Sequence, residues 1–394
     1  MNNKIEKPAK YLTKFYVFSI LIFFSFLTVI SLLLAKFEIE HDEIFLTNLD
    51  QREDPRISSY KSYPKPEFSS KITSPTSPKL IYYNRVPKCA STLMIDLLKA
   101  TSQKYNNFQI TNFHYRGISF LTKKGSKDEV NFLNTVENVL LDRNSTLAPN
   151  VYIRHQYYVD LEEALIRRDK SRTKKEDQDE TNLEMSSLVN LSKNTNTSSI
   201  AYINILRDPI ERFISSYYFS RFGSDVTINL KSLNKATNVN PKYINDTVEE
   251  CIKFNRPECQ EKTFNNLMTK FFCGREKFCF GDEEVDKIRA IELAKSNLVK
   301  VYKVVGIYEE LELSVKLMEA NFPEVFSGIY SVYLENFVRQ TGSSGAIGHQ
   351  KTKTKKIESE ATKEILRKYL KYDVELYELA KQVFEGKIKE YGIS

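Results

Sequence analysis

The amino-acid sequence predicts an α/β domain with a central parallel sheet flanked by helices. After residue 80, short apolar runs alternate with helical patterns along most of the chain, as they do in successive strand–helix units. The chain has 394 residues, of which 41% are hydrophobic, so it can bury a sizeable core. No internal repeat is evident, and we expect one large domain.

The order of these patterns places each element. Strands are predicted at Leu80–Tyr83, Asn150–Arg154, Ala201–Leu206 and at the end of Leu298–Ile307. Helices are predicted at Ser91–Ala100, Ile210–Arg221, Glu309–Ala320 and, with room for one break, Glu358–Tyr391. The stretch 167–199 is charged and then rich in Asn, Ser and Thr, which is typical of a disordered surface insertion.

The N-terminus predicts a membrane anchor. Phe15–Ala35 is an uncharged run of 21 residues, long enough to cross a bilayer as a helix. Lysines precede this run and acidic residues follow it, so the short tail is expected in the cytoplasm. A cleaved signal peptide is the alternative, but the run is long and "LLLAKFEIE" is a poor cleavage site. We therefore predict a cytoplasmic tail (1–14), an uncleaved type II anchor (15–35), a flexible stem (36–79) and a lumenal domain (80–394).

The cysteines and sequons agree with a lumenal domain. In an oxidising lumen, four closely spaced cysteines can form two bridges, most simply Cys251–Cys259 and Cys273–Cys279. A zinc site is the alternative, but the spacing lacks paired CxxC motifs. We predict the two disulfides, with Cys89 as the odd thiol. Candidate glycosylation sites are Asn144, Asn190, Asn196 and Asn245.

The charge balance favours an acidic partner. The formal net charge is +7 and the pI about 8.8, which suits nucleic acid, a membrane surface, or a sulfated or phosphorylated substrate.

The turn after the first predicted strand reads "NRVPKCAST" (84–92). It combines basic and small hydroxyl residues immediately before a helix start, where backbone N–H groups and the positive helix end favour an anion. The nucleotide-binding motif GxxxxGK[ST] does not occur in the chain. We therefore expect this turn to bind an anion without that motif.

A second turn has the same character. Asp208 is a good helix N-cap and Pro209 a good first helical residue, so Arg207 is expected at the end of a strand, where ligands of parallel sheets bind. Ser215 lies further along the same helix and can face the same cleft. Alone, this segment is more simply a structural Arg–Asp pair. Together the two turns predict a ligand with anionic groups at two places.

Both segments resemble a known family. "YYNRVPKCAST" (82–92) and "YINILRDPIERFISSYYFSRFG" (202–223) are similar to the donor-binding motifs of the Golgi glycosaminoglycan uronosyl 2-O-sulfotransferases, which act on heparan sulfate or on chondroitin/dermatan sulfate. The resemblance extends from Leu80 to the C-terminus. It implies a P-loop-like sulfotransferase domain, Golgi residence, and 3′-phosphoadenosine 5′-phosphosulfate as the sulfuryl donor, transferred to the 2-hydroxyl of a uronic acid without a metal.

The resemblance also implies roles for individual residues. The 5′-phosphosulfate would be held by the first turn, namely Arg85, Lys88, Cys89, Ala90, Ser91 and Thr92. The 3′-phosphate would be held by Arg207, Ser215, Lys351 and Thr352. The chain departs from the family at Cys89, where Thr is usual, and in the 167–199 insertion; neither touches a charged donor contact, so we expect activity to survive.

Among four histidines, His155 directly follows a predicted strand and matches the family's catalytic histidine. We predict that it is the base, that Lys88 stabilises the leaving group, and that Arg116 and Arg154 contact the polyanionic acceptor. The Arg154–His155 pair resembles the chondroitin/dermatan-type enzymes more than the heparan type. The acceptor choice and a homo-oligomeric state stay open.

Two other readings share the anchor and the basic charge. One is a type II Golgi glycosyltransferase, and the other is a noncatalytic heparin-binding membrane protein. The second does not account for two organised anion turns and a placed histidine. Nucleic acid is not an expected partner of a lumenal domain.

Overall fold

The computed structural model describes residues 78–111, 124–141, 148–172, 199–224, 231, 233–234, 239–338 and 352–394, all within one compact unit of residues 66–394. The predicted tail, anchor and almost all of the stem lie outside these ranges. Within them, no helix is both long enough and apolar enough to cross a bilayer.

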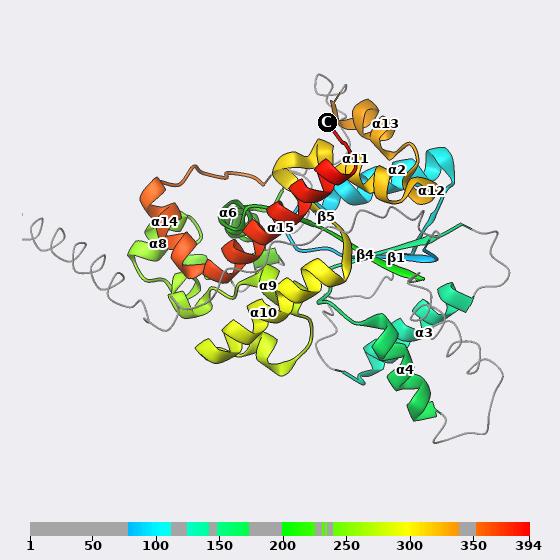
Figure 1. Ribbon diagram of the computed structural model, residues 1–394. Helices are drawn as coiled ribbons and strands as arrows, with labels where there is room; N and C mark the ends of the chain where they lie inside the picture. Colours follow the sequence, from blue (N-terminus) through cyan, green and yellow to red (C-terminus); the bar gives the residue numbers. More distant parts are fainter. Residues whose placement is uncertain are drawn as a thin grey trace, which may run out of the picture. The chain divides into compact units, whose positions relative to one another are not determined.

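A five-stranded parallel sheet lies at the centre of this unit (Figure 1). Its order is β2-β3-β1-β4-β5, and every neighbouring pair is parallel. The strands are β1 Leu80–Asn84, β2 Gln109–Thr111, β3 Asn150–Arg154, β4 Ile200–Leu206 and β5 Tyr302–Ile307. The predicted parallel sheet is confirmed. Only β2 lacked a sequence signal, because three residues without a buried run are too short to show one.

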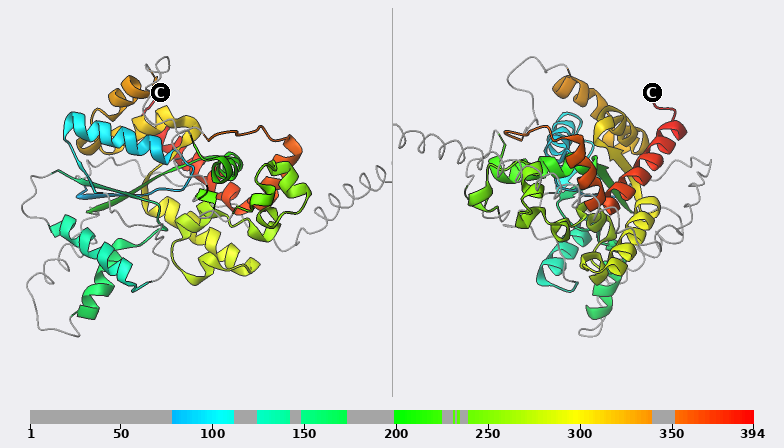
Figure 2. Two further views of the ribbon diagram at one scale, coloured as in Figure 1. Left: turned by 180° about the vertical axis from the view of Figure 1, so that it is seen from behind. Right: turned by 90° about the vertical axis from the view of Figure 1, so that its left-hand side faces the viewer.

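Helices cover both faces of the sheet (Figure 2). Helices α2, α11, α12 and α13 lie on one face, whereas α3, α4, α9 and α10 lie on the other, and α15 packs against β5 and α10. The helices are α2 Ser91–Tyr105, α3 Lys127–Leu141, α4 Leu161–Arg172, α6 Pro209–Phe222, α8 Val248–Lys253, α9 Leu267–Cys273, α10 Glu284–Lys300, α11 Leu311–Asn321, α12 Pro323–Phe326, α13 Ile329–Tyr333, α14 Glu360–Tyr369 and α15 Lys371–Glu390. Short 3-10 turns η2 (Pro241–Tyr243), η3 (Pro257–Cys259), η4 (Glu261–Thr263), η5 (Lys277–Phe280) and η6 (Tyr308–Glu310), and a π-helical turn (Leu334–Val338), join them.

Because both faces are covered, strands β1 and β4 are buried along their whole length. Every residue of β1 and β4 is buried, which explains why their sequences are continuous apolar runs rather than alternating ones. A row of tyrosines crosses the sheet in register, from Tyr152 through Tyr82 and Tyr202 to Tyr302. Adjacent rings in this row have centroids 5.3, 5.4 and 5.9 Å apart, distances at which aromatic pairs attract each other.

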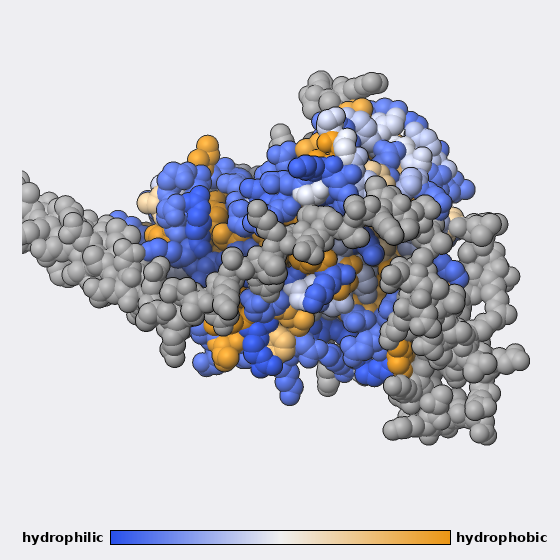
Figure 3. Space-filling view, in the orientation of Figure 1, coloured by the Kyte–Doolittle hydropathy of each residue, from blue (hydrophilic) through white to orange (hydrophobic). Residues whose placement is uncertain are grey.

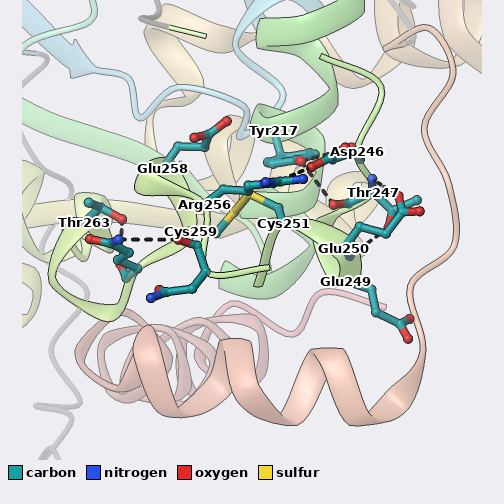
Figure 4. Close-up of a disulfide and its surroundings, with 12 residues drawn as sticks. Tyr217, Asp246, Thr247, Glu249, Glu250, Cys251, Arg256, Glu258, Cys259 and Thr263 are labelled. Carbon is teal, nitrogen blue, oxygen red and sulfur yellow. Dashed lines mark hydrogen bonds and ion pairs between the residues drawn. A yellow bond between two sulfur atoms is a disulfide. The ribbon is translucent and has the colours of Figure 1, made fainter. Parts of the chain in front are cut away.

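A second, smaller core lies beside the sheet. It is formed by α6, α8 and α14 and includes Ile214, Tyr218, Val248 and Leu366. Its disulfide, Cys251–Cys259, is drawn in Figure 4 beside the ion pair of Arg256 with Asp246. On the face seen in Figure 3, the described surface is mostly hydrophilic, with apolar residues in small separate areas.

Both predicted disulfides are present. Cys251 bonds Cys259 and Cys273 bonds Cys279, which leaves Cys89 as a free, buried thiol. Of the four predicted sequons, Asn245 is exposed within the described residues, and the other three lie outside them.

The predicted start of the insertion, residue 167, is too early, because residues 167–172 belong to helix α4. Helix α4 continues to Arg172, and Arg168 pairs at 2.9 Å with Glu137 of α3. Arg167 likewise pairs at 2.9 Å with the buried Glu129. The dense charge that marks this stretch as polar in sequence is therefore, at its start, a set of ion pairs between two packed helices. Residues 173–198 lie outside the described ranges.

Candidate active site

The first anion turn connects β1 to α2 with an unusual backbone. Lys88 has φ +68° and Ala90 has φ +55°, so two non-glycine residues adopt the left-handed conformation on either side of Cys89. Such residues cost free energy, on the order of 1 kcal/mol each, and gather where a backbone is shaped for function. Successive N–H groups in a turn of this kind form a cradle for an anion. The turn therefore has a backbone shape that suits the anion-binding role predicted for it, which stays a prediction.

The small residues of this turn have structural roles. Ser91 is buried, and its hydroxyl donates to the Val86 carbonyl at 3.0 Å, which closes the turn on itself. Cys89 has no exposed surface, and burial raises the pKa of its thiol to about 12. The thiol is therefore a packing group rather than a substitute for a hydroxyl donor, and its assignment to the donor site stays a prediction.

The second anion turn connects β4 to α6 as predicted. The Asp208 side chain accepts from the Glu211 N–H at 2.9 Å, and Pro209 opens the helix. Arg207 leaves this turn toward the first one: its Nη1 lies 3.5 Å from the Lys88 carbonyl, and its guanidinium stacks over Tyr308 at 4.8 Å from the ring centroid. The ends of β1 and β4 are adjacent in the sheet, so the two turns lie side by side.

The segment 352–358, here called the strap, completes this cluster from the far end of the chain. Thr352 forms an isolated antiparallel bridge with Ser224, just beyond α6. Its hydroxyl lies 3.3 Å from Lys88 Nζ and 3.5 Å from Ser215 Oγ. Three residues predicted to bind the donor, Lys88, Ser215 and Thr352, therefore meet at one point. Lys351 lies outside the described residues.

Lys88 is a partly desolvated cation. Its ammonium lies 4.0 Å from the centre of the Phe219 ring. Burial, together with the charges of Arg207 and Lys355, lowers the pKa of Lys88 to about 8. Lys88, Arg207 and Lys355 are three cations close to one another, and their combined positive charge favours an anionic ligand. One acidic group, Glu211, offsets part of the charge by pairing with Lys355 at 2.6 Å and Arg207 at 3.8 Å.

His155 follows β3 and faces the first turn. Its Nδ1 lies 2.9 Å from the Arg85 carbonyl, an atom that can only accept, so Nδ1 carries the proton and Nε2 keeps its lone pair. Burial, helped by the charge of Arg85, lowers the pKa of His155 to about 3. The ring is therefore neutral near pH 7, the state that a general base requires.

Of the two arginines predicted to contact the acceptor, the structure describes only Arg154. Arg154 is the last residue of β3, opposite Asn84 in the register, and is half-buried next to His155. Arg116 lies outside the described residues, as do the other three histidines.

Several contacting residues carried no sequence signal. The Phe219 ring contacts Lys88 and the Tyr308 ring contacts Arg207. Lys355 forms an ion pair with Glu211. An aromatic residue in an apolar helix and a lysine in a charged loop are both ordinary in sequence. A buried Asn at the end of β1, Asn84, was visible in the motif but had no role assigned to it.

Two arginines could each bind one anionic group of a donor. Arg85 from the first turn and Arg207 from the second each retain a buried Nε atom with no hydrogen-bond partner in the described part of the chain.

A pocket elsewhere, lined by α9, η5 and α10 residues that include Lys270 and Lys287, shares no residue with these turns. In the described ranges, no group of three or more His, Cys, Asp or Glu side chains could hold a metal ion.

Ligands of parallel α/β folds bind at the carboxyl ends of adjacent strands, and here that edge carries two turns with basic residues and a neutral histidine, an arrangement that suits an anionic ligand. A profile of the sulfotransferase family matches residues 72–380, and the chain belongs to that family. The resemblance drawn from the sequence is thereby confirmed.

Individual relatives are distant but extensive. The chain is 26% identical to the human uronyl 2-sulfotransferase over 321 residues, which are 80% of this chain and 65% of that protein. It is 31% identical over 312 residues to heparan sulfate 2-O-sulfotransferase 1 of Xenopus laevis, covering 78% of this chain and 70% of that protein. The matched region thus spans about two thirds of the length of these relatives.

Proposed function

We propose that the protein transfers the sulfuryl group of 3′-phosphoadenosine 5′-phosphosulfate to the 2-hydroxyl of uronic acid residues in a glycosaminoglycan. The observation that carries the proposal is the joint placement of His155 and Lys88. His155 bonds to the backbone of Arg85, three residues before Lys88, so one short loop sets the distance between a neutral base and a cation.

Each turn would hold one end of the donor. Residues 85–92 of the first turn surround the 5′-phosphosulfate, with the orphan Nε of Arg85 and the backbone of the left-handed turn as donors. Arg207, Ser215, Thr352 and Lys351 hold the 3′-phosphate. The meeting of Ser215 and Thr352 at 3.5 Å supports that assignment.

The transfer is a single in-line displacement. His155 Nε2 accepts the proton of the acceptor 2-hydroxyl while that oxygen forms its bond to sulfur. The bond from sulfur to the bridging oxygen of the 5′-phosphate breaks, and Lys88 stabilises the charge that grows on the departing oxygen. The uronate carboxylate and the charge on the sulfuryl oxygens both favour the imidazolium as the proton arrives, which offsets the low pKa of His155. The displacement needs no metal.

Two substitutions separate these roles. Lys88→Ala should lower kcat by on the order of 10³-fold, because it removes charge stabilisation from the transition state. His155→Ala should lower kcat by about 10²- to 10⁴-fold and leave the affinity for the product adenosine 3′,5′-bisphosphate within about twofold of wild type. Calorimetric binding and single-turnover transfer measure the two quantities. Wild-type turnover in either variant would remove the corresponding assignment.

The acceptor is decided by a direct assay. The segment from Pro64 onward is incubated with labelled donor and with desulfated heparan, chondroitin and dermatan chains in parallel, and disaccharide analysis locates the new sulfate. A 2-O-sulfated uronic acid in one chain type supports the proposal and selects the acceptor. Tight binding of the bisphosphate without transfer to any chain would keep the donor site and reject the acceptor class.

The alternatives predict other ligands. A glycosyltransferase would bind a nucleotide sugar, commonly through a metal at an Asp-x-Asp triplet; one such triplet, Asp177-Gln178-Asp179, does occur in the chain, in the stretch 167–199. A heparin-binding protein without catalysis would not discriminate between the bisphosphate and other nucleotides. Competition between these nucleotides on a bisphosphate column distinguishes all three.

The protein is further proposed to be a type II membrane protein of the Golgi apparatus, with residues 15–35 as its anchor, 36–79 as the stem and the catalytic domain in the lumen. Full-length protein should stay with membranes after alkaline carbonate extraction, whereas a chain beginning at Pro64 should not. Extraction of the full-length protein would contradict the anchor, and protease accessibility in sealed vesicles tests its orientation.

A further inference from the structure

Asn84 is a fully buried amide at the carboxyl end of β1. None of its surface is exposed, yet every part of the side chain has a partner. Its Oδ1 accepts from the Tyr302 hydroxyl at 2.8 Å and from Asn204 Nδ2 at 3.2 Å. Its Nδ2 donates to the Gln156 carbonyl at 3.4 Å and to the Phe271 carbonyl at 3.5 Å. A buried amide is costly unless it is paired, and this one is paired on both sides.

The partners of Asn84 surround the histidine. Asn84 directly precedes Arg85, whose carbonyl accepts from His155 Nδ1, and Gln156 directly follows His155. Two hydrogen bonds therefore join the pair Asn84–Arg85 to the pair His155–Gln156. The Asn84 side chain donates to the Gln156 carbonyl, and the His155 side chain donates to the Arg85 carbonyl. They continue the pairing of β1 with β3 beyond the last ladder pair, Asn84 with Arg154.

Asn204 and Tyr302 hold the amide in this orientation. Asn204 on β4 donates to both the carbonyl and the Oδ1 of Asn84, at 2.9 and 3.2 Å, while its own Oδ1 accepts from the Ile205 N–H at 2.9 Å. Tyr302 on β5 donates from the next strand. With donors on Oδ1, the amide cannot flip, so its N–H groups must point toward Gln156 and Phe271. The cluster thus joins β1, β4, β5 and α9 behind the histidine.

Packing alone does not call for these side chains. The surrounding sheet positions are filled by apolar and aromatic residues, and an apolar residue at position 84 would need no partners. We propose that Asn84, Asn204 and Tyr302 are positioning residues that fix the ring of His155 relative to the Lys88 turn. The inference rests on the proposed function for its catalytic consequence, but the orientation of the ring can be measured without catalysis.

Tyr302→Phe tests the proposal with a small change, because it removes one hydroxyl and keeps the ring in the tyrosine row. Tyr202→Phe is the matched control: this tyrosine is in the same row and is also buried, but its hydroxyl bonds to the Val159 carbonyl and the Leu161 N–H instead. In Tyr302→Phe, kcat should fall by on the order of tenfold to a hundredfold, since a displaced catalytic group has that effect. Affinity for adenosine 3′,5′-bisphosphate should change less than about twofold, because the donor turn keeps its own anchors. Tyr202→Phe should leave both quantities near wild type.

A second measurement does not depend on turnover. Proteins labelled with ¹⁵N-histidine report the tautomer of each ring, and His155→Gln identifies the His155 signals among four histidines. Wild type and Tyr202→Phe should show a proton fixed on Nδ1, whereas Tyr302→Phe should show a mixture of tautomers. If Tyr302→Phe matches Tyr202→Phe in its tautomer, the positioning role is wrong, whatever the activity. If wild type binds the bisphosphate but transfers nothing, the proposed function fails while the tautomer measurement still decides this inference.

Discussion

At the scale of single residues, the proposed site combines a neutral histidine with a lysine that is easily neutralised. Burial lowers the pKa of both groups, to about 3 for His155 and, with help from Arg207 and Lys355, to about 8 for Lys88. Because burial disfavours the charged form of each, the same cause favours the form of His155 that the proposed mechanism requires and disfavours the required form of Lys88.

These two shifts predict a one-sided pH profile. In the proposed mechanism Lys88 acts protonated, so kcat/KM should hold below its pKa and fall as pH rises through about 8, reaching about a tenth by pH 9. His155 acts neutral, and its pKa of about 3 means that it adds no loss of activity between pH 5 and 7. Initial rates at low substrate concentration measure the profile.

Lys88→Arg identifies the group behind the alkaline limb. A guanidinium stays charged to beyond pH 12, so any activity that this variant retains should persist above pH 8. An unchanged limb near pH 8 in Lys88→Arg would assign it to another residue.

At the scale of elements, the strap connects a distant part of the chain to the turns that carry Lys88 and Arg207. Lys353 N–H donates to the Gly223 carbonyl at 3.1 Å, and Lys355 pairs with Glu211 of α6. The strap ends at Glu358, which is buried and accepts from the Tyr218 hydroxyl and, at 3.3 Å, from the Glu249 N–H. Both ends of the strap are thus attached to the second core, and Thr352 is held against Lys88.

Loosening the strap should weaken donor binding. Glu358→Gln removes the charge that fastens it, so the dissociation constant of adenosine 3′,5′-bisphosphate should rise about three- to tenfold, the effect of losing about one hydrogen bond. Calorimetry measures the change. Glu360→Gln is the control, because that carboxylate is two residues away, 75% exposed, and pairs only locally with Lys363 among its described contacts. Equal effects of the two substitutions would show that the strap contact does not matter for the donor.

At the scale of the whole molecule, buried polar contacts join the two cores. Asp373 at the start of α15 has no exposed surface, and it accepts from the N–H groups of Met268 and Thr269 at 3.1 and 2.8 Å, which caps the start of α9. Its carboxylate also lies 3.9 Å from Arg212 of α6. The C-terminal helix therefore links α9, which borders the His155 network, to α6, which carries Ser215.

The disulfides predict a countable pattern of thiols. Denatured but unreduced protein should take one alkylating label per chain, on Cys89, and reduced protein should take five, as read by mass spectrometry. Native protein should take none, because Cys89 is buried. The bridges close loops of 8 and 6 residues, so reduction should lower the free energy of unfolding by about 2 kcal/mol for each. Labelling of all five thiols without reductant would contradict the bridges.

Much of this architecture can be read from local patterns. Buried parallel strands read as continuous apolar runs, and β1, β3 and β4 were predicted to within a residue at each end. The cap of α6 at Asp208 follows from local chemistry as well, and the C-terminal helix has its one break, at Leu370, a position that the sequence did not predict. Such signals arise because a helix start or a doubly covered strand constrains nearby residues directly.

The assembled site depends on contacts between residues far apart in the chain. Lys88 meets Thr352 across 264 positions, and Asn84 meets Tyr302 across 218, through side chains whose types are common elsewhere in the sequence. Local patterns therefore predicted two anion-binding turns, because strand ends and helix starts carry their own signals, and the family resemblance added the donor and the role of the histidine. The strap, the ring faces and the amide behind His155 needed the folded chain, since hydrogen bonding and burial there depend on which elements the sheet order brings together.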